Sequence, residues 1–169
     1  MKLFKRKETV VIVCTANITR SPYFAGRLKH ELAKLDIPSS KLPEILSAGT
    51  HAKPRVSPHP IMQTVAELRD INIKSELSNL FDESMAKKAD LVLTMEISHK
   101  EHILDQFPKL AGKIFTVLEY GKEISEEMVL DIDDPTGGEM DDYKKYADLA
   151  DAQAQRLRRY YKKNKKFSS

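Results

Sequence analysis

The chain has 169 residues, of which 41% are hydrophobic and 31% are charged, and its formal net charge at pH 7 is +3. This length predicts a single domain over 1–169 with room for a hydrophobic core. The charge is too small to indicate nucleic-acid binding, and the longest apolar run, TVVIVC, is too short for a membrane span or a secretory signal. One cysteine excludes an internal disulfide, and we expect a cytoplasmic protein.

Lysine and arginine gather near both ends of the chain, in KLFKRK and RLRRYYKKNKK. Such runs of charge are typical of solvated termini. We therefore expect residues 1–8 and 164–169 to be flexible, basic ends.

Short β-rich runs alternate with segments of helical period along the chain. The sequence predicts strands over 9–13, 44–49, 90–95 and 113–118, and helices over 22–35, 61–68, 98–107 and 143–161. Ser21 is expected to cap the first helix, and Ser98 with Glu101 the third. The alternation predicts an α/β fold in three layers, a four-stranded parallel sheet with helices on both faces. Ligands of such folds bind at the carboxyl ends of the strands.

The only cysteine, Cys14, lies where the first strand ends, and Arg20 follows six residues later. A loop between a strand and a helix amino terminus offers backbone N–H groups and partial positive charge, which both favour a bound phosphate. Arg20 can donate two hydrogen bonds to phosphate oxygens, and Cys14, as a thiolate, is a nucleophile. Asn17 suits the middle of the loop because asparagine tolerates left-handed backbone angles. The alternative is a buried cysteine kept for packing.

This pattern predicts a phosphate-binding loop after the first strand. The residues that would hold the phosphate through their amides are Thr15, Ala16, Asn17, Ile18, Thr19 and Arg20.

A second candidate segment is DIDDPTGG, which carries the carboxylates of Asp131, Asp133 and Asp134. A leaving group needs a proton at neutral pH, and an adjacent carboxyl can deliver it and then activate water as a base. Asp134 precedes Pro135, which stiffens the loop that would present it. Spacing alone leaves the three carboxylates open, and a merely solvated acidic turn is also typical.

The stretch VCTANITRSP resembles the phosphate-binding loop of the low-molecular-weight protein tyrosine phosphatases. The resemblance extends to SAGT, ADLVLTM and DIDDPTGG, and so covers nearly the whole chain. It implies that Cys14 is the nucleophile, that Arg20 binds the phosphate and the transition state, that Ser21 stabilises the departing thiolate and that Asp134 is the general acid.

The same resemblance implies that Asn17 and Ser47 brace the loop. A family histidine in the bracing network is replaced here, with Ser75 as the candidate substitute. The usual loop glycine is Ala16, and Thr19 stands where many members carry a second cysteine that protects the nucleophile as a disulfide. Cys14 is therefore expected to be vulnerable to over-oxidation.

The segments expected to line the substrate-binding site depart from the family pattern as well. Tyrosine-specific members carry aromatic residues after the Asp-Pro pair and after the second strand, where this chain reads TGG and HAKPRV. In HAKPRV, His51, Lys53 and Arg55 either favour acidic substrates or form an ordinary solvated loop. Ile18 favours phosphotyrosine, because the family's protein-arginine phosphatases carry threonine at the matching position.

The resemblance implies a protein-tyrosine phosphatase that works without a metal or a cofactor. Its expected partners are a phosphotyrosine-containing protein and a tyrosine kinase, with no nucleic acid and no membrane span, and the sequence does not indicate an oligomeric state. The alternatives are a protein-arginine phosphatase, an arsenate reductase that uses an external thiol, and a phosphate-binding module without turnover.

Two pairs of residues that carry reactive groups are expected to have no chemical role. His99 and His102 are interpreted as surface residues rather than metal ligands. Tyr143 and Tyr146 are interpreted as helix-face residues rather than phosphorylation sites.

Overall fold

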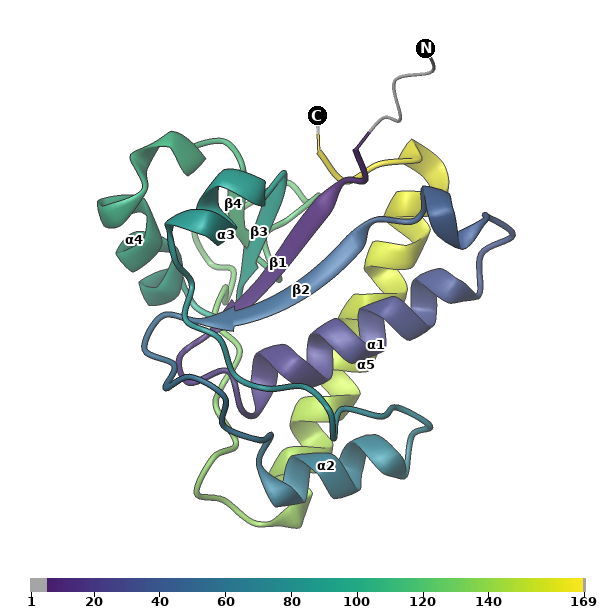
Figure 1. The fold of residues 1–169 in the computed structure, drawn as a ribbon, viewed down its shortest axis with the longest axis vertical. Helices are drawn as coiled ribbons and strands as arrows, with labels where there is room; N and C mark the ends of the chain where they lie inside the picture. Colours follow the sequence, from purple (N-terminus) through teal and green to yellow (C-terminus); the bar gives the residue numbers. More distant parts are fainter. Residues whose placement is uncertain (1–5, 169) are drawn as a thin grey trace.

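A parallel sheet forms the middle layer of the molecule, seen in a computed structural model that describes residues 6–168 (Figure 1). Its strands are β1 (Thr9–Cys14), β2 (Glu44–Gly49), β3 (Leu91–Thr94) and β4 (Ile114–Thr116), in the order β2-β1-β3-β4. Every neighbouring pair is parallel. The carboxyl ends of the strands therefore meet at one edge, where Cys14 ends the interior strand β1 beside Gly49 of β2.

Helices cover both faces of the sheet, as the sequence predicts (Figure 1). One face packs against α1 (Arg20–Ala33), α2 (Pro60–Glu67) and α5 (Met140–Asn164), and the other against α3 (Glu83–Lys88) and α4 (Ile97–Gln106). Short 3₁₀ turns span Ser39–Lys41 and Pro108–Leu110. None of the helices within residues 6–168 is both long and apolar enough to cross a membrane.

The position of β1 between two layers of helices explains why its sequence is apolar throughout. Val10 and Ile12 belong to the cluster beneath α1 and α5, whereas Val11 and Val13 belong to the cluster beneath α4. Successive side chains of a strand point to opposite faces, so a strand between two helical layers must be apolar on both. The predicted three-layer α/β fold is confirmed.

Two predicted helix caps are wrong. Helix α1 begins at Arg20, with Thr19 at its N-cap position, so Ser21 lies inside the first turn, and its hydroxyl donates to the carbonyl of Ala48 at 3.2 Å. Helix α4 begins at Ile97 after Glu96, and the hydroxyl of Ser98 donates to the Glu96 carboxylate at 3.1 Å. Among the described residues, no side chain caps the first turn of either helix.

The carboxyl end of the chain is attached to the fold. Phe167 is buried against the rings of Tyr120, Tyr160 and Tyr161, and its backbone N–H donates to the carboxylate of Glu8 at 3.0 Å. Phe167 lies within the segment 164–169 that the sequence predicts to be a flexible end, and its apolar side chain is buried in the structure. Of the predicted flexible ends, residues 1–5 and 169 lie outside the described residues.

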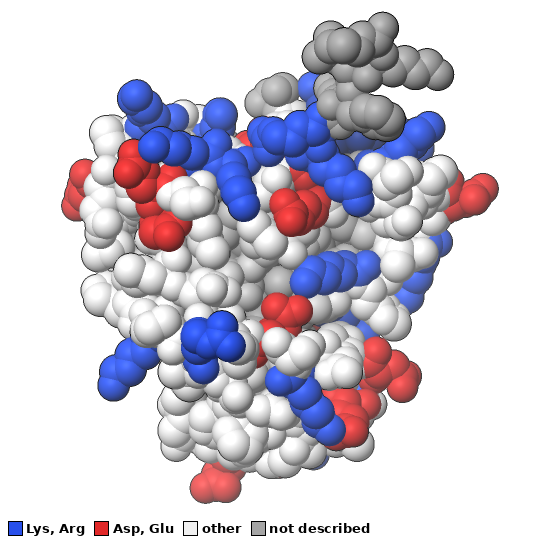
Figure 2. Space-filling model, viewed as in Figure 1, with Lys and Arg blue, Asp and Glu red and all other residues white. Residues whose placement is uncertain are grey.

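Basic side chains gather near the ends of the chain, at the top of the view in Figure 2. A shallow pocket there is lined by Arg6, Lys7, Lys41, Lys165 and Lys166 among others. It lies by the amino end of β1, so this basic region is remote from Cys14 at the other end of that strand.

Candidate active site

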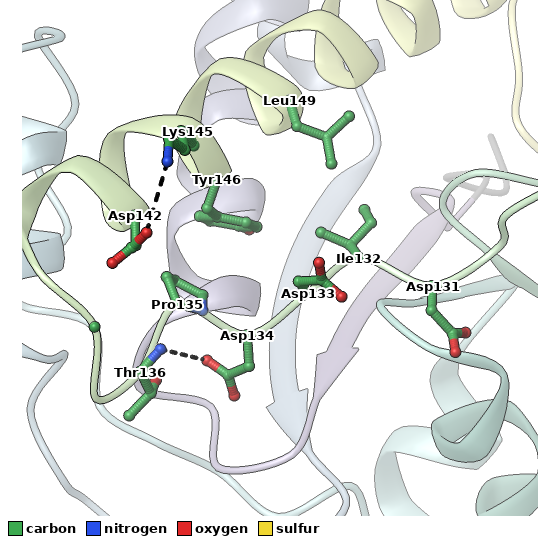
Figure 3. Close-up of a pocket in the computed structure, with 11 residues that line it drawn as sticks. Asp131, Ile132, Asp133, Asp134, Pro135, Thr136, Asp142, Lys145, Tyr146 and Leu149 are labelled. Atoms are coloured by element: carbon green, nitrogen blue, oxygen red, sulfur yellow. Dashed lines mark hydrogen bonds and ion pairs between the residues drawn. The ribbon is translucent and has the colours of Figure 1, made fainter.

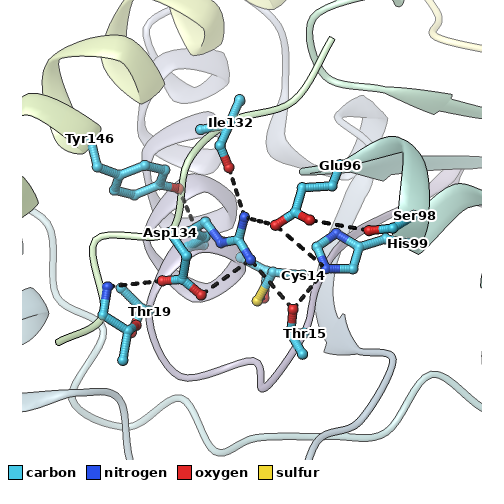
Figure 4. Close-up of polar contacts among 12 residues, drawn as sticks. Cys14, Thr15, Thr19, Glu96, Ser98, His99, Ile132, Asp134 and Tyr146 are labelled. Carbon is cyan, nitrogen blue, oxygen red and sulfur yellow. Dashed lines mark hydrogen bonds and ion pairs between the residues drawn. The ribbon is translucent and has the colours of Figure 1, made fainter.

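The loop from Cys14 to Arg20 connects β1 to α1 at the carboxyl edge of the sheet (Figure 4). Cys14 is a free, buried cysteine, and its Sγ lies 3.0 Å from the Ser21 hydroxyl. Asn17 has a φ of 56°, the left-handed conformation that its residue type tolerates. The first turn of α1 begins at Arg20, so its free N–H groups face the loop, as anion binding requires.

The side chain of Asn17 ties the loop to three neighbours. Its Nδ2 donates to the hydroxyls of Ser21 at 2.8 Å and Ser47 at 2.9 Å, and its Oδ1 accepts from the backbone N–H of Asn79 at 2.8 Å. Asn17 and Ser47 thus lie where a bracing role needs them. The third contact comes from a backbone amide and not from the side chain of Ser75, which has no bond to Asn17 in the described structure.

Gly49 allows the loop to lie against β2. A Cβ at this position would be 2.4 Å from the carbonyl oxygen of Thr15 and 3.0 Å from the amide nitrogen of Asn17. Both are backbone atoms, so neither can turn aside as a flexible side chain would. The glycine of SAGT is therefore required by close backbone approach.

Arg20 is almost fully buried, with 1% of its surface exposed. Its Nη1 donates to Glu96 and, at 2.7 Å, to the carbonyl of Ile132, while Nη2 lies 3.2 Å from Asp134. Burial by itself would lower the pKa of Arg20, but the bond to Glu96 and the negative charges nearby outweigh it and raise that pKa. Its buried Nε has no partner among the described residues, so a donor is available for a phosphate oxygen.

Glu96 is a functional candidate that the sequence analysis missed. It lies two residues after the end of β3, the strand next to β1, and it pairs with Arg20 (Figure 4). Burial would raise the pKa of this carboxyl, but the hydrogen bond and charge of Arg20 hold it below its usual value. The rule that ligand-binding groups follow parallel strands could have found it, because Glu96 is the first residue after ADLVLTM.

His99 is buried, and its interpretation as a surface residue is wrong. Its exposed fraction is 4%, and its Nε2 lies 2.8 Å from the Thr15 hydroxyl. Burial lowers the pKa of His99, although the charges of Glu96, Asp131 and Asp134 oppose that effect. A neutral imidazole therefore contacts Thr15 at the loop. In the sequence, the only sign of this role is that His99 lies one helical turn after Glu96.

The acid loop, residues 131–136, places its three aspartates differently. Asp134 faces Arg20, and its Oδ1 accepts from the backbone N–H of Thr136 at 3.0 Å. Asp131 accepts from the N–H of Ile97 at 2.7 Å, at the start of α4. Asp133 is exposed and lines a pocket. Of the three carboxylates, Asp134 is therefore the one beside the phosphate-binding loop.

A pocket separates the acid loop from the first turns of α5 (Figure 3). Residues 131–136 form one wall, and Asp142, Lys145, Tyr146 and Leu149 form the other. Neither Cys14 nor Arg20 lines it. This cavity therefore lies between the acid loop and α5 and is separate from the phosphate-binding loop.

Two tyrosines of α5 hold the phosphate-binding loop from behind. The Tyr146 hydroxyl donates to the carbonyl of Arg20 at 2.5 Å. Tyr143 stacks on His59, whose backbone N–H donates to the carbonyl of Ile18 at 2.7 Å. Both tyrosines are at most 5% exposed, so their role is packing and hydrogen bonding.

Residues 51–56 and 136–138, where tyrosine-specific members are expected to carry aromatic residues, contain no phenylalanine, tyrosine or tryptophan. His51, Lys53 and Arg55 are exposed on the loop after β2. The His51 ring lies 4.8 Å from that of His102, centroid to centroid. Within residues 6–168, no group of three or more histidine, cysteine, aspartate or glutamate side chains converges to hold a metal.

A parallel sheet whose interior strand ends in a Cys-x5-Arg loop, facing an Asp-Pro loop, defines a cysteine-based enzyme that acts on phosphate esters or their analogues. A family model described as low molecular weight phosphotyrosine protein phosphatase matches residues 9–167. The chain belongs to that family, and it is therefore an enzyme of the hydrolase class.

Individual relatives span most of the chain. The protein-arginine-phosphatase of Bacillus subtilis is 30% identical and covers 93% of this chain and 99% of its own. The low molecular weight protein-tyrosine-phosphatase Wzb of Salmonella typhimurium is 26% identical and covers 62% of this chain and 65% of its own.

Two solved structures show the same fold over the described domain. The YwlE arginine phosphatase of Geobacillus stearothermophilus has a TM-score of 0.81 at 25% identity and covers 94% of this chain and 95% of its own. The low molecular weight protein tyrosine phosphatase of T. tengcongensis has a TM-score of 0.78 at 31% identity and covers 89% and 97%.

Proposed function

We propose that this protein is a protein-tyrosine phosphatase that works through a cysteinyl-phosphate intermediate. The observation that carries the proposal is the convergence of three side chains at one strand end. Cys14 begins the loop, Arg20 is buried at its far end, and Asp134 lies 3.2 Å from the Arg20 guanidinium. These are a nucleophile, an anion clamp and a proton donor within one site.

The first step forms the intermediate. The Cys14 thiolate attacks phosphorus while the loop amides and the Arg20 guanidinium hold the non-bridging oxygens. Asp134 gives its proton to the leaving oxygen as the bond from phosphorus to that oxygen breaks. Negative charge that develops on phosphate in the transition state is met by donors already in place.

The second step releases phosphate. Asp134, now a carboxylate, takes a proton from water as the water attacks the cysteinyl phosphate, and the bond between sulfur and phosphorus breaks. The Ser21 hydroxyl, 3.0 Å from Sγ, stabilises the thiolate as it departs. Asn17 keeps that hydroxyl in place through its 2.8 Å bond.

Substrate choice rests on Ile18, which is half-buried in the loop. A branched apolar side chain suits a phenyl ring better than a guanidinium group, so Ile18 favours phosphotyrosine. The substrate is then a cytoplasmic protein that a tyrosine kinase has phosphorylated.

Phosphoarginine is the second candidate. It is favoured by the Bacillus subtilis relative, a protein-arginine-phosphatase with 99% of its own length covered, and by the absence of aromatic residues from 51–56 and 136–138. Arsenate reduction with an external thiol is the third candidate, and the acid loop argues against it because that reaction has no organic leaving group.

Matched phosphotyrosine, phosphoarginine and phosphoserine peptides test this proposal, with a metal chelator present and an arsenate-reduction assay alongside. We expect hydrolysis of phosphotyrosine to be fastest and to disappear in Cys14→Ala. Faster hydrolysis of phosphoarginine would keep the mechanism and replace the substrate. Thiol-dependent arsenate reduction without hydrolysis would overturn the proposal.

A further inference from the structure

A direct contact joins the phosphate-binding loop to the acid loop through two threonine hydroxyls. The Thr136 hydroxyl donates to the Thr19 hydroxyl, and the two oxygens are 3.1 Å apart. Thr19 is 3% exposed and lies immediately before Arg20. Thr136 lies two residues after Asp134 and is exposed. The contact therefore links the neighbours of the two charged groups at the centre of the site.

Two further contacts hold the carboxylate of Asp134, one from Thr136 and one from Arg20. The backbone N–H of Thr136 donates to Asp134 Oδ1 at 3.0 Å, which fixes the carboxylate relative to Thr136 itself. The other carboxylate oxygen is paired with Arg20 at 3.2 Å. Thr19 fixes Thr136, Thr136 orients Asp134, and Asp134 faces Arg20, so the contacts form a closed ring across the two loops.

Only part of this ring depends on charge. The proposed first step requires a protonated Asp134, and a neutral carboxyl loses its charge attraction to Arg20. A bound phosphate also competes with Asp134 for the Arg20 N–H groups. The Thr19–Thr136 hydrogen bond involves neither the guanidinium nor the carboxyl, so neither event removes it. It is then the contact that still fixes Asp134 when the proton is transferred.

We propose that Thr19 and Thr136 are positioning residues whose hydroxyl contact holds the acid loop over the phosphate-binding loop and so sets the reach of Asp134 to the leaving oxygen. The inference rests on the proposed role of Asp134 as general acid. The side chain of Thr19 then has a role of its own, in addition to the phosphate binding proposed for its backbone amide. Asp134 itself is exposed and lines the pocket beside α5, so the hydroxyl contact adds a fixed point next to it.

The test compares two substrates that differ only in the leaving group, phenyl phosphate and p-nitrophenyl phosphate. Phenolate needs the proton from Asp134, whereas p-nitrophenolate leaves readily without one. We expect Thr136→Val and Thr19→Val each to lower the ratio of kcat/KM for phenyl phosphate to kcat/KM for p-nitrophenyl phosphate, which reports the first step alone, by about 3- to 10-fold, the factor of one net hydrogen bond. The double variant is expected to lose no more than either single variant, because one bond is removed in all three.

Two further variants separate positioning from structure. Thr136→Ser keeps the hydroxyl and is expected to restore the ratio, and Thr136→Val in an Asp134→Ala background is expected to leave the ratio of that background unchanged. Inhibition by inorganic phosphate measures whether the phosphate-binding loop itself is intact in each variant. Equal losses on both substrates, additive losses in the double variant, or no rescue by serine would overturn the inference alone. If Asp134→Ala itself shows no dependence on the leaving group, the acid role fails and the positioning role fails with it.

Discussion

Arg20 has two carboxylate partners, Glu96 and Asp134, and their surroundings give them different tasks. Glu96 is bonded to Arg20 Nη1 and also accepts from Ser98, so it belongs to a fixed network at the end of β3. Asp134 is 40% exposed at its side chain and sits on a loop. A buried cation needs a lasting counter-charge, and an acid that serves a leaving group needs access to it. Glu96 meets the first requirement and Asp134 the second.

Replacing Asp134 tests this division at a single residue. Asp134→Ala is expected to slow hydrolysis of a phosphotyrosine peptide by about 100- to 10,000-fold, the usual contribution of a general acid, and that of p-nitrophenyl phosphate far less. Steady-state rates on both substrates measure the difference. Asp133→Asn is the matched control, an exposed neighbour with no contact to Arg20 among the described residues, and it is expected to keep both rates. A leaving-group effect in Asp133→Asn and not in Asp134→Ala would transfer the role.

Local sequence signals identified some residues of the site and not others. Cys14, Asn17 and Arg20 share one continuous loop, so their spacing is visible in the sequence. Glu96 and His99 contact that loop only because β3 pairs with β1, a neighbour relation that no local pattern encodes. Asn79 reaches Asn17 through its backbone, whose position does not depend on residue type.

At the scale of elements, the strand ends position the site. Strands β1, β2 and β3 each end at it, contributing Cys14, Gly49 and the turn to Glu96. Their extents are close to those predicted, because β-branched and apolar runs bounded by polar residues are a strong signal. Helix starts were predicted less well. The hydroxyls of Ser21 and Ser98 resemble caps in sequence, but they donate to the Ala48 carbonyl and to the Glu96 carboxylate instead.

The close contact between Gly49 of β2 and the phosphate-binding loop can be tested by substitution. Gly49→Ala is expected to weaken inhibition by inorganic phosphate at least about tenfold, because the new Cβ would lie 2.4 Å from the Thr15 carbonyl and must displace the loop backbone. Gly112→Ala is the control. It lies before β4 with a φ of 81° and open space around it, so it strains the backbone without contact to the loop.

The two variants separate by their readouts. Urea unfolding should report a loss of stability in both, about 1–2 kcal/mol for Gly112→Ala, whose backbone is left-handed. Only Gly49→Ala should change the inhibition constant of phosphate. An unchanged phosphate affinity in Gly49→Ala would contradict the required close approach.

At the scale of the whole molecule, one buried histidine links stability to pH. His99 is 4% exposed, and burial lowers its pKa below the ordinary value of 6.5. Above that pH the ring is neutral in both the folded and the unfolded chain. Below it the unfolded chain binds a proton that the folded chain does not, so the free energy of unfolding falls as the pH falls.

His99→Asn is expected to reduce this pH dependence. Asparagine does not titrate, so the loss of stability between pH 7.5 and pH 5.5, measured by urea unfolding, should be smaller than in the unaltered protein. The comparison uses the difference between the two pH values in each protein, so a constant loss from the changed contact with Thr15 cancels. The same difference in both proteins would show that His99 is not held neutral by the fold.

The central claim is a covalent phosphate on Cys14, and trapping it is the most direct measurement. The Asp134→Ala variant is mixed with p-nitrophenyl phosphate. The first step still proceeds because p-nitrophenolate leaves without a proton, but hydrolysis of the cysteinyl phosphate is slow because its base is missing. Intact mass and peptide mapping at neutral pH then locate the phosphoryl group, with Cys14→Ala as the control. The account predicts one phosphoryl group per chain on the peptide that contains Cys14, and none in the control. A phosphoryl group on another residue, or continued turnover in Cys14→Ala, would contradict it.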